Sequence, residues 1–155
     1  MCIVVDPPLF VPIFKTSHPE HGVYGPVLAW ICSGHGKFVL GGSIYFQELG
    51  GVRSVLPHLA ELERRGKIVR RDTAAVDKQV ALARAAEPCK DFDDPHLVGL
   101  IRESGCKLIC ISDPRSHKYL RDVKLYRSFN ERPKLYTRET NHSLLCLENV
   151  AACCK

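Results

Sequence analysis

Four carboxylates occupy positions where α/β chains commonly hold functional groups. Asp6 and Asp113 each follow a short apolar run, residues 2–5 and residues 108–111, that predicts a buried strand. Glu48 and Asp94 lie in or at the start of predicted helices. Because ligands of open α/β sheets bind beyond the carboxyl ends of the strands, we expect the fold to bring these four acids together there.

Four carboxylates gathered in one place repel one another, and a divalent cation between them relieves the repulsion. Oxygen-only ligands favour hard cations, so the expected cofactor is Mg²⁺ or Mn²⁺, held by Asp6, Glu48, Asp94 and Asp113. Such an ion retains water and binds phosphate oxygens, which favours hydrolysis of a phosphodiester without a serine or cysteine nucleophile. The four acids are thus candidate catalytic residues as well as metal ligands. Asp93 competes with Asp94 for the third position.

The elements that must position these acids are clearest in residues 93–113. Asp94 followed by Pro95 is a helix start signal, and Gly105 is a natural helix stop. The apolar strand of residues 108–111 then ends just before Asp113. Taken alone, Asp94 is typical of a helix N-cap, but one carboxylate oxygen can cap the helix while the other binds metal.

Strand and helix patterns alternate along the rest of the chain. Strands are expected at residues 2–5, 38–40, 67–70 and 108–111, with further edge strands at 134–136 and 143–147; helices are expected at 24–33, 44–49 (with Ser43 as N-cap), 55–65, 73–86 and in the stretch before Gly105. Residues 115–132 form a basic segment of mixed pattern. The alternation predicts an α/β chain, a three-layer α/β/α sandwich with a mostly parallel central sheet. We expect one domain over residues 1–150 and a short tail, 151–155.

The net charge of +5 favours polyanionic partners such as nucleic acid. The candidates for RNA contact lie in two basic segments and are Arg65, Lys67, Arg115, Lys118 and Arg121. The open alternative is that these segments are ordinary solvated faces. Eight cysteines without a secretory signal or a CxxC pair indicate buried thiols in a reducing compartment. We therefore expect a soluble, cytoplasmic protein with no membrane span.

The acid motifs together resemble those of the PIN-domain nucleases. Val4-Val5-Asp6 is similar to the family's first strand and first acid, and residues 45–49 resemble the segment that carries the second. Asp94-Pro95-His96 resembles the third-acid motif, and residues 109–113 resemble the fourth. The resemblance covers almost the whole chain and implies a Mg²⁺- or Mn²⁺-dependent endoribonuclease that hydrolyses single-stranded or structured RNA. Many family members are toxins of toxin–antitoxin pairs, and dimers are common. An antitoxin or other regulatory protein and a second copy of the chain are therefore implied partners.

Two departures from the family pattern favour an alternative. Pro7 and Pro8 follow Asp6, where the family has a small residue and then a polar one, and Ile111 stands where the family has a hydroxyl. The neighbouring Ser112 is the candidate to supply that hydroxyl. These departures lie next to the acids and do not replace them. They favour the alternative that the chain is a PIN-like module with weak or lost activity, which binds RNA or another protein.

Overall fold

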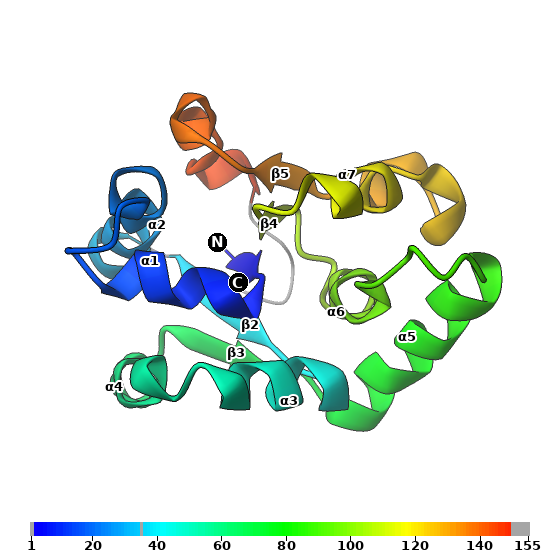
Figure 1. Cartoon of the computed structure of the whole chain (residues 1–155), viewed down its shortest axis with the longest axis horizontal. Helices are drawn as coiled ribbons and strands as arrows, with labels where there is room; N and C mark the ends of the chain where they lie inside the picture. The colour runs from blue at the N-terminus through cyan, green and yellow to red at the C-terminus, as the bar shows by residue number, and fades with distance from the viewer. Residues whose placement is uncertain (1, 35, 150–155) are drawn as a thin grey trace.

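Five parallel strands form one sheet in the order β3-β2-β1-β4-β5 (Figure 1). The computed structural model describes residues 2–34 and 36–149. The strands are β1 (Cys2–Val5), β2 (Lys37–Leu40), β3 (Ile68–Arg70), β4 (Leu108–Cys110) and β5 (Lys134–Tyr136). The α-helices in these residues are α1 (Phe10–Phe14), α2 (His21–Ser33), α3 (Ser43–Gly51), α4 (Leu56–Arg64), α5 (Thr73–Ala86), α6 (Pro95–Ser104) and α7 (Pro114–Leu120).

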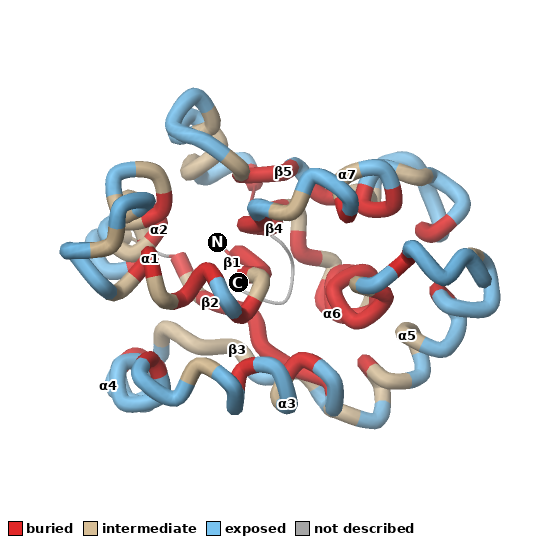
Figure 2. Tube along the Cα trace, in the orientation of Figure 1, coloured by how far each residue is buried: buried red, intermediate tan, exposed pale blue. Residues whose placement is uncertain are grey.

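Helices cover both faces of the sheet. In Figure 1, α1 and α2 lie on one face and α5 and α6 on the other, which makes the fold the expected three-layer α/β/α sandwich. Strand β1 is central, and all four of its residues are completely buried (Figure 2). Because both faces of a parallel sheet are covered, its inner strands consist of uninterrupted apolar residues, as β1 and β4 do.

The strand order changes direction between β1 and β4. From β1 the chain adds β2 and β3 on one side, and then crosses to add β4 and β5 on the other. The carboxyl ends of β1 and β4 are neighbours, since the Asp6 amide donates to the Cys110 carbonyl at 2.9 Å. In open α/β sheets such a switch point creates a crevice for ligands. Asp6 follows β1 and Asp113 follows β4 at this point.

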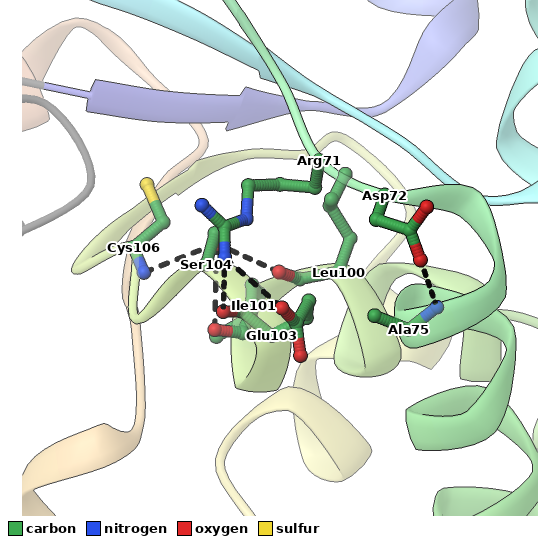
Figure 3. Close-up of polar contacts among 8 residues, drawn as sticks. All are labelled: Arg71, Asp72, Ala75, Leu100, Ile101, Glu103, Ser104 and Cys106. Carbon is green, nitrogen blue, oxygen red and sulfur yellow. Dashed lines mark hydrogen bonds and ion pairs between the residues drawn. The ribbon is translucent and has the colours of Figure 1, made fainter.

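Helix α6 is fixed to the sheet near its carboxyl end (Figure 3). Arg71, just after β3, donates from Nη2 to Oε1 of Glu103 at 3.0 Å. The Ser104 hydroxyl donates to the Leu100 carbonyl at 2.7 Å and accepts from the Cys106 amide at 3.2 Å, across the turn into β4. The turn residue between them, Gly105, has φ +65°, a left-handed conformation that glycine adopts without strain. These contacts fix the position of the helix that begins at Asp94.

The two helices of the second face touch closely at Gly99. A Cβ atom at this position would lie 2.5 Å from Cγ2 of Val80 and 2.8 Å from its backbone nitrogen. The absence of a side chain at Gly99 therefore allows α6 to approach the backbone of α5.

Most of the expected elements are confirmed, two expectations are wrong, and one helix was missed. Gly42 occupies the N-cap of α3, while the Ser43 hydroxyl donates to Oδ2 of Asp77 at 2.5 Å. The basic segment after Asp113 contains α7. The apolar run at residues 143–147 belongs to 3₁₀ turns, Glu139–Leu144 and Leu147–Asn149, and not to a strand. The tail, 151–155, lies outside the described residues.

Two further expectations concern membranes and cysteines. Among the described residues, no helix is both long and apolar enough to span a membrane. Cys110 is a buried free thiol, as expected, and Cys106 is also buried. Cys32 and Cys89 are exposed, so the expectation of buried thiols is wrong for these two.

Candidate metal centre

Asp6 is the centre of the acid group. It is partly buried at the end of β1, and its pKa is raised from 3.8 to about 7. The first cause is burial, which disfavours the charged carboxylate, and the others are the negative charges of Asp94, Glu48 and Asp113. The other three acids expected from the sequence therefore all act on Asp6, although the four come from separate segments of the chain.

The two prolines after Asp6 leave its carboxylate without amide donors. Pro7 and Pro8 have no N–H group, and the amide of Leu9 donates to the backbone carbonyl of Asp6 at 2.9 Å. A carboxylate at a helix N-cap normally accepts from these positions, and such hydrogen bonds lower its pKa. Among the described residues the Asp6 side chain makes no capping hydrogen bond, so no amide of this turn stabilises its charge.

Helix α3 carries Glu48 to the same edge, and Tyr45 fixes that helix to β1. The buried Tyr45 hydroxyl donates to the Val5 carbonyl at 2.6 Å, one residue before Asp6. Glu48 lies one turn later on the same side of α3. Its pKa is raised, first by partial burial and then by the charge of Asp94.

His96 lies beneath the acids in the first turn of α6. It is only 1% exposed, and burial lowers its pKa despite the opposing charge of Asp94. Its Nε2 atom is 3.2 Å from Oε2 of Glu48, but the approach is not aligned for a hydrogen bond. Within the described residues neither ring nitrogen has a hydrogen-bond partner. Burying an imidazole with neither nitrogen hydrogen-bonded destabilises the fold. The ring lies beside the carboxylate of Glu48.

Asp94 is at the N-cap position of α6, but its side chain does not cap the helix. Its Oδ2 instead accepts a short hydrogen bond from the hydroxyl of Ser116, a buried residue in α7. Asp93 points elsewhere: its side chain is 57% exposed and its Oδ2 is 3.7 Å from Nη1 of Arg115. The acid that acts on Asp6 is thus Asp94, as preferred from the sequence.

Asp113 is held by its own helix. Its Oδ1 accepts from the Arg115 amide at 2.9 Å and caps α7. The Arg115 guanidinium also donates to Oδ2, from Nη2 at 2.8 Å and from Nε at 3.0 Å. These side-chain and backbone hydrogen bonds lower the pKa of Asp113. A guanidinium here occupies carboxylate oxygens that a metal ion would otherwise bind.

The acids do not form a closed ligand set. Among the described residues, no group of three or more His, Cys, Asp or Glu side chains is close enough to hold a metal ion as arranged. Two of the four acids already have other partners, since Ser116 binds Asp94 and Arg115 binds Asp113. The donor chemistry nevertheless fits a hard cation, because the ligands are all oxygen and Asp6 is left unstabilised. Asp6, Glu48 and Asp94 are the residues that would hold such an ion, while both oxygens of Asp113 are bound by Arg115.

The basic candidates divide between the two edges of the sheet. Arg115 and Lys118 line a hollow of about 300 Å³ beside the acids, together with Asp93. Arg65 and Lys67 precede β3 and therefore lie at the amino edge, with Lys67 Nζ donating to the Gly34 carbonyl at 2.7 Å. These two are not brought to the acid group.

Arg121 ends α7, and its backbone carbonyl accepts from Nη1 of Arg132 at 2.9 Å. It is exposed and lines a different hollow, at the start of β4 and β5.

The sequence interpretation missed two supporting residues and named one that is exposed. Ser112, expected to supply a hydroxyl, is exposed, and Ser116 binds Asp94 instead. The pair Asp113-Pro114 is the same helix start signal as Asp94-Pro95 and could have revealed α7, which carries Ser116. No sequence signal indicated that Tyr45 binds the end of β1.

Comparisons with known proteins add nothing to this geometry: no family model, no curated protein and no solved structure matched the chain.

Proposed function

We propose that this chain is a PIN-like endoribonuclease that uses Mg²⁺ or Mn²⁺ to hydrolyse RNA. The observation that carries the proposal is the raised pKa of Asp6, because three other carboxylates from three other segments cause part of that rise. Carboxylates that repel one another destabilise a fold, and groups of this kind occur most often at functional sites. The switch point of an open α/β sheet is a usual place for such a site. An oxygen-only site with unsatisfied negative charge is suited to a divalent cation.

Each residue has a role in this proposal. Asp6, Glu48 and Asp94 would hold the ion, which when bound supplies an activated water and neutralises charge on the phosphate. Asp113 completes the site when Arg115 leaves it. Arg115 and Lys118, on the wall of the adjacent hollow, would then contact phosphate oxygens of the RNA. In the reaction, water adds to phosphorus and one P–O ester bond of the backbone breaks.

Cleavage of labelled RNA by the purified chain tests this function. We expect cleavage with Mn²⁺ or Mg²⁺ and none in EDTA, and we expect Asp94→Asn to lower the rate by more than roughly 100-fold. Glu20→Gln is the matched control, since Glu20 is an exposed acid that neither raises the pKa of Asp6 nor lines the hollow beside the acids. Equal cleavage by wild type and Asp94→Asn would reject the assignment of the acids.

A second candidate function is a PIN-like module without catalysis that binds RNA or docks a protein. The observation in its favour is the hydrogen-bonded pair of Arg115 and Asp113, which satisfies one acid without metal. Thermal melting with and without Mn²⁺ separates the two functions. A metal-dependent rise in melting temperature that disappears in Asp113→Asn excludes the metal-free module.

The family resemblance also supports proposals about context. They are a cytoplasmic location, a homodimer, and regulation by an antitoxin or another protein. Light scattering of the purified chain tests the dimer. Co-expression with the product of a short neighbouring gene tests the regulator, which should suppress any growth arrest that the chain causes.

A further inference from the structure

A second hollow in the described part of the protein lies away from the acids. It has a volume of about 510 Å³ and is lined by cations from four positions, Lys107, Arg121, Arg132 and Lys134. Lys107 precedes β4 and Lys134 begins β5, so the hollow lies at the amino edge of the sheet. The candidate metal centre is at the carboxyl edge.

Among the described residues these four cations have no carboxylate partner, unlike several other cations. Arg71, for example, pairs with Glu103, and Lys124 pairs with Glu87. Within residues 2–34 and 36–149, no carboxylate oxygen is within 4.0 Å of the charged nitrogens of the four cations in the hollow. Glu148 also lies on the wall, and it forms no ion pair with another described residue. The hollow therefore carries an excess of positive charge.

An aromatic ring and a guanidinium form a platform at this hollow. Phe129 is 66% exposed, an unusual exposure for a large apolar side chain, and the Cζ atom of Arg132 lies 3.7 Å from its ring centroid. Backbone carbonyls hold the charged groups: Nη1 of Arg132 donates to Arg121 at 2.9 Å, and Nζ of Lys107 donates to Asn130 at 2.5 Å. The platform is thus ordered without a ligand.

We propose that this hollow binds single-stranded RNA. An exposed ring stacked with a guanidinium offers a surface on which an unpaired base can stack, and the surrounding cations attract the phosphates on either side. Arginine has five N–H donors and lysine three, so the bonds to backbone carbonyls leave donors for phosphate. Bases in a duplex are already stacked and cannot use the ring. The proposal rests on the proposed function in one respect: the strand held here is taken to be the substrate of the metal centre.

Fluorescence anisotropy in EDTA tests binding without cleavage, using a labelled single-stranded RNA of about a dozen nucleotides. We expect Phe129→Ala to weaken binding roughly 5- to 100-fold, the range for loss of one stacked base, and Phe129→Trp to retain it. Lys134→Gln should lower the slope of log affinity against log salt by about 0.7, the value for one phosphate contact to a single strand. Annealing the RNA to its complement should weaken its binding.

The controls are Leu82→Ala, which removes another exposed apolar side chain, and Lys78→Gln, which removes an exposed cation on the same helix, α5. Both should bind RNA like the wild type. Unchanged affinity in Phe129→Ala overturns the proposal. This holds even if Lys134→Gln binds RNA more weakly, because binding that depends on the cations but not on the ring is the binding of any polyanion to a basic surface. Equal affinity for the duplex, or displacement of RNA by a polyglutamate peptide at equal charge concentration, also overturns it.

The outcomes for the two sites can be told apart. If RNA binds as described in EDTA but is not cleaved with Mn²⁺, the proposed function fails and the binding site stands. If RNA is cleaved and Phe129→Ala leaves both the affinity and KM unchanged, the binding site fails and the function stands.

Discussion

Replacing Asp6 with asparagine should stabilise the metal-free protein at alkaline pH. The wild-type carboxylate has a pKa of about 7 in the fold against 3.8 ordinarily. At 1.36 kcal/mol per pH unit this difference corresponds to an upper limit of about 4 kcal/mol. Water reaches the partly exposed side chain and reduces the effect, so we expect a gain of roughly 1–3 kcal/mol in the free energy of unfolding.

The sign follows from proton linkage. Between pH 3.8 and about 7 the folded chain keeps the Asp6 proton while the unfolded chain has lost it. The contribution of Asp6 to the free energy of unfolding is therefore most favourable at low pH. It falls as the pH rises toward about 7 and is constant at higher pH. The gain from Asp6→Asn should accordingly be small near pH 4 and largest near pH 8.

Urea unfolding in EDTA, followed by the fluorescence of the single tryptophan, Trp30, measures this difference. For a chain of 155 residues, each kcal/mol corresponds to about 2–4 °C in melting temperature. Addition of Mn²⁺ should stabilise the wild type and reduce or reverse the advantage of Asp6→Asn, because binding to the folded state raises its stability. Asp91→Asn serves as the control and should change stability at neither pH.

One result would refute the reasoning. If Asp6→Asn is no more stable than the wild type near pH 8 in EDTA, burial and the other three acids do not raise the pKa of Asp6 as their arrangement indicates. The electrostatic support for a metal centre would then be lost, whatever the activity of the chain.

Three further substitutions test the surroundings of the acids. Arg115→Gln should free Asp113 and strengthen Mn²⁺ binding in calorimetry, and weaker binding would mean that the guanidinium does not compete with metal. Tyr45→Phe should cost about 1–3 kcal/mol in urea unfolding, because the buried Val5 carbonyl loses its donor; no loss would show that this hydrogen bond does not hold α3. Gly99→Ala should cost at least about 1–3 kcal/mol, since the new methyl group meets the backbone of Val80; wild-type stability would contradict the close packing of α5 and α6.

Arg115 connects the two candidate functions. Its guanidinium binds Asp113, and the same side chain lines the adjacent hollow; under the proposed function it would leave Asp113 and bind a phosphate of the RNA. The binding of RNA and the completion of the metal centre would then favour each other. In the metal-free module, by contrast, the same ion pair is permanent.

Local sequence was sufficient for most of the fold. The apolar runs of β1 and β4 can be buried on both faces only in a covered parallel sheet. Asp72 caps α5 through the Ala75 amide, as its position at the start of an amphipathic run predicts. Such signals depend only on residues that are close in sequence, so they can be read without knowing the tertiary structure.

Short apolar runs were ambiguous. Residues 143–147 could form a strand by composition, yet Leu144 and Leu145 pack on the core from a 3₁₀ turn and its end. Whether such a run pairs as a strand depends on whether a free edge of the sheet lies beside it in the tertiary structure. The five residues themselves contain no information about that edge.

The sequence by itself determined that Asp6, Glu48, Asp94 and Asp113 would follow strands or lie on helices at one edge, because strand direction and helix starts are local properties. Only the tertiary structure decided their chemical states. Ser116 binds Asp94, Arg115 binds Asp113, and Asp6 is left as the acid with a pKa near 7. Charge interactions depend on distances in space between segments far apart in the chain, and those distances exist only after the sheet has formed.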